Sequence, residues 1–203
     1  MKLLKTNFYD IIRLYIFQIG ITIFSLFLYT AVGFVEDAVF FNRLRIAVSV
    51  FSMVFYFVLI YYMLWEMGAK DKIRIDGGRM EPMKGKGMLL CLFANIPNFI
   101  ISFVSLLLIV VFLIGGSQGV WSGYVATYTI NLFHESIYMG FIQGVVPEVV
   151  SSDPQFVDYT YYLVQSILFV VFPTLSILVG HFSYYLGSKE KKFLTLFSSK
   201  KSN

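Results

Sequence analysis

The sequence predicts an all-α fold, an integral membrane helical bundle with four transmembrane helices and one amphipathic or re-entrant helix on its outer face. Three observations support this prediction. Apolar residues make up 58% of the 203-residue chain and charged residues only 14%, whereas a soluble domain carries about 25% charged residues. The charges are segregated, which leaves long apolar runs. Lys and Arg gather beside the ends of those runs, as is typical of polytopic membrane proteins.

Four segments are long enough to span a membrane. A helix needs about 20 apolar residues to cross the hydrocarbon core, where its backbone can pair only with itself. Segments 14–35, 46–65, 88–115 and 161–186 reach that length, and their interiors contain no Lys, Arg, Asp or Glu. We expect residues 1–192 to form a single transmembrane domain. The Ser- and Lys-rich tail 193–203 is expected to be disordered.

The basic residues predict how the spans are oriented. Lys and Arg gather in the N-terminal segment, in the loop 66–87 and in the C-terminal tail, and are absent between Gly87 and Ser188. Because such loops stay in the cytoplasm, an even number of spans is required to keep all three on that side. The first outer loop keeps Arg43 and Arg45, which Glu36 and Asp37 balance locally. We therefore expect a multi-pass protein of the cell membrane whose N- and C-termini are both cytoplasmic.

The outer segment 116–160 allows two interpretations. Its stretch 124–146 is apolar enough for a fifth span, but His134 and Glu135 would then lie near the middle of that span. A charged residue there costs about 2.5–3.5 kcal/mol, and an odd number of spans would export the lysine-rich tail. Polar residues at helical spacing form one stripe: Thr127, Asn131, His134, Glu135 and Tyr138. We therefore predict an amphipathic helix on or dipping into the outer leaflet, ended by Pro147, with the fifth span as the alternative.

The first candidate site is an intramembrane cluster of polar side chains at similar depth: Gln18, Asn95, Asn98 and His181. Asn95 and Asn98 share one helix face, and Pro97 between them leaves a backbone carbonyl without its helical donor. Such groups could bind a small polar ligand or a file of water. The alternative is that they only form hydrogen bonds between helices.

The second candidate site is the glycine-punctuated loop 66–87, with six basic side chains that could contact a partner or anionic lipid: Lys70, Lys72, Arg74, Arg79, Lys84 and Lys86. Ile73 and Ile75 alternate with charged neighbours, and Asp76-Gly77 is a turn signal. These features predict a short hairpin. The alternative is a solvated loop that only fixes the orientation of the spans.

The sequence lacks the patterns of a known catalytic, nucleotide-binding or metal-binding site. We therefore expect no catalytic residue, no cofactor, no metal and no enzymatic activity. His134 and His181 are assigned to opposite sides of the membrane, so they cannot share a metal ion. A pump driven by protons would lack a carboxylate inside a span. The single cysteine, Cys91, excludes an intrachain disulfide.

The stretch from Trp65 to Lys72, followed by Gly78-Arg79-Met80 and Lys84-Gly85, resembles small multispanning membrane proteins of Gram-positive bacteria that have no assigned function. The resemblance is confined to the end of the second span and the loop after it. It implies that this loop is the recognisable part of the family. It implies no activity and no site residue.

These observations favour a non-enzymatic accessory or regulatory subunit that engages a membrane or cytoplasmic protein partner. The alternative is a small transporter or channel component that works through the polar face of the kinked span 88–115, alone or as a homo-oligomer. A membrane enzyme is the third possibility and would need an unrecognised catalytic group. The net charge of +4 is explained by the basic residues that orient the spans. We therefore expect the protein to associate with the lipid bilayer and not with nucleic acid.

Overall fold

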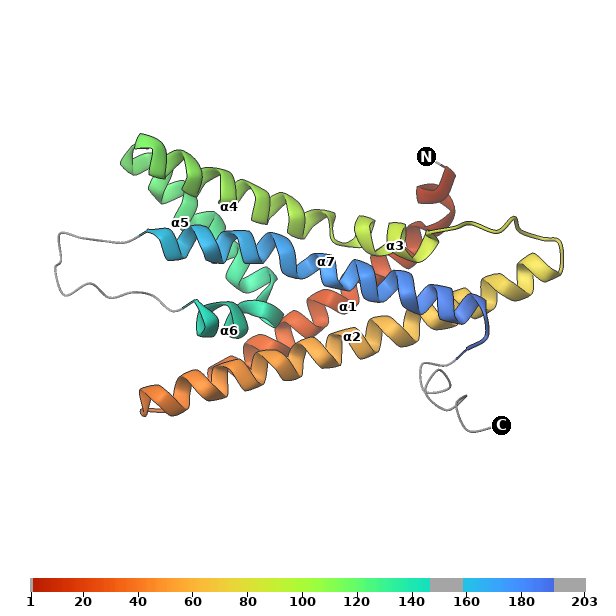
Figure 1. The fold of residues 1–203 in the computed structure, drawn as a ribbon, viewed down its shortest axis with the longest axis horizontal. Coiled ribbons are helices and arrows are strands. Elements are labelled where there is room, and N and C mark those ends of the chain that lie inside the picture. Colours follow the sequence, from red (N-terminus) through yellow and green to blue (C-terminus); the bar gives the residue numbers. More distant parts are fainter. Residues whose placement is uncertain (1, 147–158, 192–203) are drawn as a thin grey trace, which may run out of the picture. The chain divides into compact units, whose positions relative to one another are not determined.

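The computed structural model describes residues 2–146 and 159–191, and the regular structure in these ranges is entirely helical. In chain order the helices are α1 (Lys2–Val32), α2 (Ala38–Asp76), α3 (Lys86–Ala94), α4 (Ile96–Gly115), α5 (Gln118–His134), α6 (Ser136–Val145) and α7 (Thr160–Ser188) (Figure 1). Four of them, α1, α2, α4 and α7, are long and apolar enough to cross a membrane. The predicted class, an all-α membrane protein with four spans, is confirmed. Pro147, the acidic link after it and the tail 193–203 lie outside the described residues.

The span boundaries differ from the prediction at two places. The second span is part of a continuous helix of 39 residues, Ala38–Asp76, which extends beyond 46–65 at both ends. The predicted span 88–115 is divided at Asn95, whose φ of −91° and ψ of 0° end α3 and begin α4. Pro97 lies in the first turn of α4, where its missing N–H leaves no helical hydrogen bond unmade. The break therefore suits the proline better than the predicted continuous helix.

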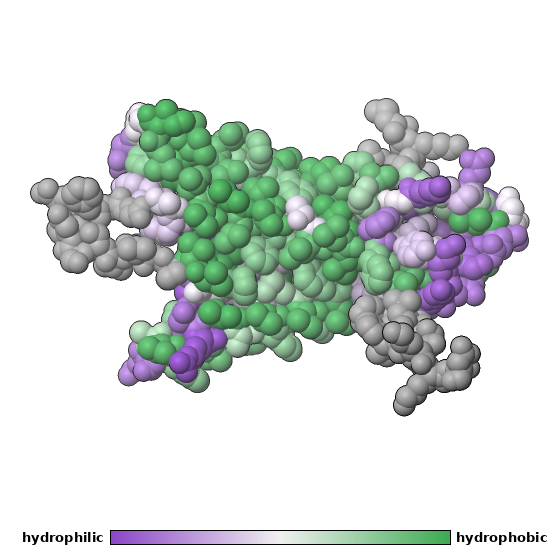
Figure 2. Space-filling model, in the orientation of Figure 1, coloured by the Kyte–Doolittle hydropathy of each residue, from purple (hydrophilic) through white to green (hydrophobic). Residues whose placement is uncertain are grey.

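The long helices bury polar side chains and expose apolar ones. On α4 the buried side chains include Asn98, Ser102 and Ser105, whereas Ile100, Phe103 and Leu107 are exposed. Figure 2 shows the resulting hydrophobic surface over α4. The same reversal occurs on α1, where Gln18 is buried and Phe27 is exposed. A water-soluble helix has the opposite pattern, so these exposed faces suit contact with lipid.

The chain divides into two compact units, and the division passes through α1, α2 and α7. Unit 1 contains Met1–Leu14, Tyr56–Ala94 and Thr174–Asn203. Unit 2 contains Tyr15–Phe55 and Asn95–Pro173. Each unit has its own buried polar groups, and we describe the two separately.

Glycines bring the helices of unit 1 into backbone contact. A Cβ added to Gly187 of α7 would overlap the carbonyl oxygen of Trp65 on α2, and one added to Gly68 of α2 would overlap the carbonyl oxygen of Tyr184. Gly180 packs in the same way against Cys91 of α3. Small residues are the usual device for close helix packing in membranes. Here they allow α2, α3 and α7 to approach closely.

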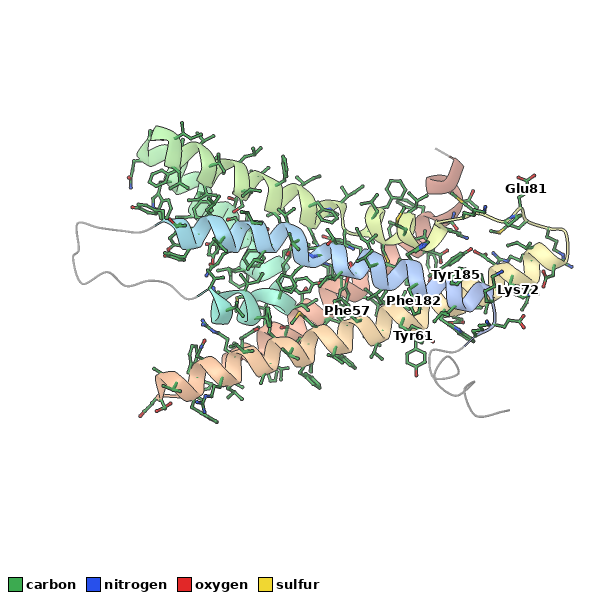
Figure 3. The ribbon with its side chains drawn as sticks, in the orientation of Figure 1. Phe57, Tyr61, Lys72, Glu81, Phe182 and Tyr185 are labelled. Carbon is green, nitrogen blue, oxygen red and sulfur yellow. The ribbon has the colours of Figure 1, made fainter. Side chains whose placement is uncertain are left out.

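The predicted hairpin in the loop 66–87 is wrong, because α2 continues as a helix to Asp76. Two ion pairs at helical spacing, Glu66–Lys70 and Lys72–Asp76, each close at 2.6 Å and favour this extension. The chain turns only after it, where Gly78 adopts a φ of +67°. Figure 3 shows Lys72 on this extension of α2 and Glu81 in the connection that follows it.

Candidate functional site

In unit 2, α5 runs back along α4. The rings of Trp121 on α5 and Phe112 on α4 lie 5.0 Å apart, centre to centre, near the beginning of α5 and the end of α4. At the other end of α5, Asn131 accepts a hydrogen bond from Ser102, in the first half of α4. The two helices are therefore antiparallel (Figure 1), and α5 returns to the depth at which α4 is well inside its span.

The next helix, α6, runs outward again along α1. The Oγ of Ser136 at its start donates to the carbonyl of Thr22 at 2.8 Å, and Ser25 donates to the carbonyl of Ser136 at 3.1 Å. One turn later, the backbone N–H of Gly140 donates to the hydroxyl of Tyr29 at 2.7 Å. Helices α6 and α1 therefore run in the same direction, toward the Val32 end of α1.

Contacts with α2 agree with this path. Ser49 donates to the carbonyl of Ile137 at 2.7 Å, and Arg45, nearer the start of α2, donates to the carbonyl of Gln143 at 3.0 Å. Because α1, α2 and α4 cross in turn, the Val32, Ala38 and Gly115 ends of these helices belong to the same side of the membrane. Segment 118–145 thus enters and leaves from one side, and we call it the re-entrant hairpin.

This geometry decides between the two interpretations of the outer segment. Helix α5 has 17 residues and α6 has 10, each short of the roughly 20 that a span requires. The fifth-span alternative is therefore wrong, and the re-entrant form of the predicted helix is the one that occurs. The polar stripe of this helix faces protein. Asn131 and Glu135 are fully buried because the stripe packs against α4 and α1.

The tip of the re-entrant hairpin is the break at Glu135, whose φ of −116° and ψ of 31° separate α5 from α6. The Oγ of Ser102 lies 2.8 Å from Oε1 of Glu135 and 3.1 Å from Oδ1 of Asn131. On the other side of the tip, the hydroxyl of Tyr15 lies 3.0 Å from Nε2 of His134. Side chains of α1, α4 and α5 therefore meet at this one point.

Three of the four predicted cluster residues lie in unit 2, and two of them adjoin the tip. Gln18 is 1% exposed and is placed on α1 between Tyr15 and Thr22, both of which bond to His134. Asn98 precedes Ser102 by one turn of α4.

Asn95 is held beside Asn98, whose Nδ2 donates to Oδ1 of Asn95 at 3.1 Å. His181 does not join this cluster, because its side chain is exposed and it belongs to unit 1.

Several buried atoms around the tip find no hydrogen-bond partner within the described part of the chain. They are the side-chain nitrogen and oxygen of Gln18, Oδ1 of Asn98, Oγ of Ser105, Nδ2 of Asn131, Nδ1 of His134 and Oε2 of Glu135. Leaving a buried donor or acceptor unsatisfied costs about 1–3 kcal/mol. Such a concentration of unsatisfied groups favours the entry of water or a small polar solute, which could supply the missing hydrogen bonds.

Glu135 is the functional candidate that sequence reasoning placed incorrectly. We expected no carboxylate at the depth of a span, and the re-entrant hairpin brings one there. Burial raises the pKa of the Glu135 carboxyl well above its ordinary value, more than its hydrogen bond with Ser102 lowers it. Burial likewise lowers the pKa of the His134 imidazole. Both side chains are therefore favoured in their neutral forms.

The basic residues after the second span divide into two groups. Lys70, Arg74, Arg79 and Lys84 are exposed, and Lys72 is half-buried. Lys86 is 6% exposed, and its Nζ lies 2.6 Å from Oδ2 of Asp71, which also accepts a hydrogen bond from the hydroxyl of Tyr184 at 2.7 Å. Lys86 is therefore unavailable to a partner or lipid, contrary to the prediction.

Among the described residues, no group of three His, Cys, Asp or Glu side chains could hold a metal ion. No family model, curated protein or solved structure matches the chain. The likeness to Gram-positive membrane proteins therefore stays a prediction.

Proposed function

We propose that this protein is a small transporter or channel component that passes a small uncharged polar solute through the polar centre of unit 2. By polar centre we mean the buried polar side chains around the hairpin tip, Gln18, Asn98, Asn131 and Glu135. The observation that carries the proposal is the set of buried, unpartnered amide and carboxyl atoms at the tip of the re-entrant hairpin. A fold that needed these helices only for packing would gain stability from apolar side chains there. Retained polar groups at membrane depth are typical of a substrate path.

The chemistry of the unpartnered atoms favours an uncharged ligand. Gln18 and Asn131 offer amide N–H donors, while Asn98 offers a carbonyl acceptor. The carboxyl of Glu135 is hydrogen-bonded to the uncharged hydroxyl of Ser102 and is favoured in its neutral form. A solute that both donates and accepts hydrogen bonds, such as a small amide or polyol, matches this set.

Re-entrant helices suit this role because they place polar groups inside the membrane without exposing backbone to lipid. The α5–α6 break at Glu135 is surrounded by α1 and α4, which satisfies the condition that irregular backbone at membrane depth be enclosed by protein. Broken helices that meet near the middle of the bilayer bind substrates in many transporters.

The proposal is tested by solute flux into liposomes that contain the purified protein. Urea and glycerol serve as probes, and light scattering follows the recovery of vesicle volume after an osmotic step. We expect faster recovery than in protein-free liposomes for at least one probe. The double variant Gln18→Leu, Asn98→Leu should lose most of the gain, whereas Gln118→Leu, which changes an exposed amide, should keep it. Equal rates with and without protein would contradict the proposal.

We also propose that the protein resides in the cell membrane with both termini in the cytoplasm. The basic segments of the sequence support this orientation. Unit 1 contains the start of α1, the end of α2 and the end of α7, which are the three helix ends that adjoin those segments. Trp65 on α2 donates a hydrogen bond to the carbonyl of Lys191 after α7 at 2.8 Å, so two of these ends are in direct contact.

The accessory-subunit hypothesis is kept as a second proposal. It is favoured by Arg79 and Lys84, which are exposed and form no ion pair within the described ranges. A stoichiometric protein partner should co-purify in mild detergent. The double variant Arg79→Glu, Lys84→Glu should recover less of that partner. The charge-preserving variant Arg79→Lys with Lys84→Arg is the control. Repeated purification of the protein alone would count against this second proposal.

A further inference from the structure

The hydroxyl of Ser102 has two acceptors but only one proton. Its Oγ lies 3.1 Å from Oδ1 of Asn131 and 2.8 Å from Oε1 of Glu135. A serine hydroxyl donates one hydrogen bond and can accept others. If it donates to Asn131, the short contact with Glu135 requires the carboxyl group to supply a proton. With Oδ1 of Asn131 facing Ser102, these distances fit a chain in which Glu135 O–H donates to Ser102, and Ser102 O–H donates to Asn131.

We propose that Glu135 is a proton-binding site and that its protonation reverses this hydrogen-bond chain. When the carboxyl O–H bond breaks and the proton leaves to water, Oε1 becomes an acceptor. Ser102 then turns its O–H toward Glu135. The amide of Asn131 rotates so that Nδ2 donates to Ser102. The reverse steps follow when a proton returns from water, and no other bond is formed or broken.

The unpartnered atoms make this reversal possible. Each group is held at one atom only, by Ser102. Nδ2 of Asn131 and Oε2 of Glu135 have no partner among the described residues, so no second hydrogen bond resists rotation of the Asn131 amide. The amide exchanges its two ends without moving the backbone. In the protonated state Asn131 presents an N–H to the polar centre, and in the deprotonated state it presents a carbonyl oxygen. Loss of one proton from Glu135 thus changes the group that Asn131 presents from a hydrogen-bond donor to an acceptor.

Other titratable groups lie on the helices around Glu135. His134 adjoins it and is bonded to Tyr15 of α1, while Tyr138 of α6 is buried nearby in the sequence. Helix α4 contributes no titratable side chain. On the other helices of unit 2, Arg45 of α2 is bonded to Gln143 of α6, and Tyr162 of α7 packs against Tyr124 and Tyr128 of α5.

This inference deepens the proposed function. Its consequence for solute selection, that pH decides whether Asn131 donates or accepts, rests on the proposed solute path. The proton-binding site itself does not. It is therefore tested by a measurement that involves no flux.

Infrared difference spectroscopy of the purified protein in lipid detects the carbonyl stretch of a protonated carboxylic acid. We expect this band at neutral pH in the native chain and in Glu36→Gln, which changes an exposed carboxyl. It should be absent in Glu135→Gln and should disappear on titration to alkaline pH. In Ser102→Ala the carboxylate loses its donor, so the titration midpoint should move upward by about one pH unit.

The outcomes separate the two proposals. Absence of the band in the native chain, its survival in Glu135→Gln, or a band that does not titrate at all would overturn the proton-binding site. An unchanged midpoint in Ser102→Ala would overturn the reversal of the hydrogen-bond chain. A band that behaves as expected, in a protein that passes neither urea nor glycerol, would uphold the proton-binding site and remove the proposed function.

Discussion

Both compact units bury polar groups, but they satisfy them differently. In unit 1 the Asp71 carboxylate, 3% exposed, accepts from Lys86 and Tyr184, and the surrounding helices are packed through glycines. In unit 2 the groups at the hairpin tip remain partly unpartnered. A fully satisfied buried network holds helices in one arrangement, whereas an incompletely satisfied one has capacity for a ligand. We infer that unit 1 serves mainly stability and unit 2 mainly function.

The largest expected effect on stability comes from the Asp71 network of unit 1. Asp71→Leu leaves the Lys86 ammonium buried without its partner, which destabilises a protein by about 3–5 kcal/mol. The free energy of unfolding in detergent should fall accordingly. Glu66→Gln, which breaks only the exposed ion pair with Lys70, should have a far smaller effect. Equal losses in the two variants would show that the Asp71 network is not a special source of stability.

The second prediction, a smaller loss of stability, concerns the close packing of helices in unit 1. In Gly187→Ala the new methyl group would overlap the carbonyl oxygen of Trp65, and backbone must shift to make room. Overpacking of this kind costs about 1–3 kcal/mol. Gly20→Ala is the control, since a Cβ there meets nothing within 4 Å, and it should be neutral or slightly stabilising. A thermal unfolding midpoint unchanged in Gly187→Ala would contradict the close approach of α2 and α7.

The third prediction concerns pH and unit 2. Above the ordinary value of 4.5, the unfolded chain loses the Glu135 proton that the folded protein keeps. The folded state then binds more protons, so this group makes stability fall as pH rises, by about 1.4 kcal/mol per unit until the folded pKa is passed. The difference in unfolding free energy between the native chain and Glu135→Gln should show this slope. A flat difference across that range would mean that Glu135 is ionised in the fold.

The smallest expected effect is a gain in stability, in contrast to the losses above. Gln18→Leu removes two buried amide atoms that lack partners and fills the same space with apolar atoms. Such an exchange is neutral or stabilising, by about 1 kcal/mol here. Calorimetry in detergent measures it, alongside the loss of flux expected of the double variant that contains this change. A marked loss of stability would show that Gln18 is a structural hydrogen-bonding residue, like the groups of unit 1.

The sequence was sufficient to predict the four spans because hydrophobic length is a local property. It was insufficient for the tip of the re-entrant hairpin. The stripe that includes Asn131 and Glu135 has the spacing of a helix face, and that spacing is the same whether the face meets water or a polar neighbour. Only Ser102, distant in sequence, decides between them. A polar stripe facing serines spaced along another span is the signal that could have indicated burial.

The loop after the second span shows a similar limit. Ile73 and Ile75 suggested the alternation of a strand, but ion pairs at helical spacing such as Lys72–Asp76 favour the helix. The pairing of Lys86 with Asp71 joins two ends of one loop, and no pattern within the loop distinguished this lysine from its exposed neighbours. Local patterns gave the composition of both candidate sites, whereas their geometry depended on tertiary contacts.

Labelling of single cysteines by a membrane-impermeant maleimide tests the re-entrant hairpin most directly. In a background with Cys91→Ala, Gln118→Cys and Val145→Cys mark the start of α5 and the end of α6. The account predicts that both react from one side of the membrane and that Gly78→Cys reacts from the other. Reaction of positions 118 and 145 from opposite sides would mean that the segment crosses the membrane, and the enclosed site at Glu135 would be contradicted.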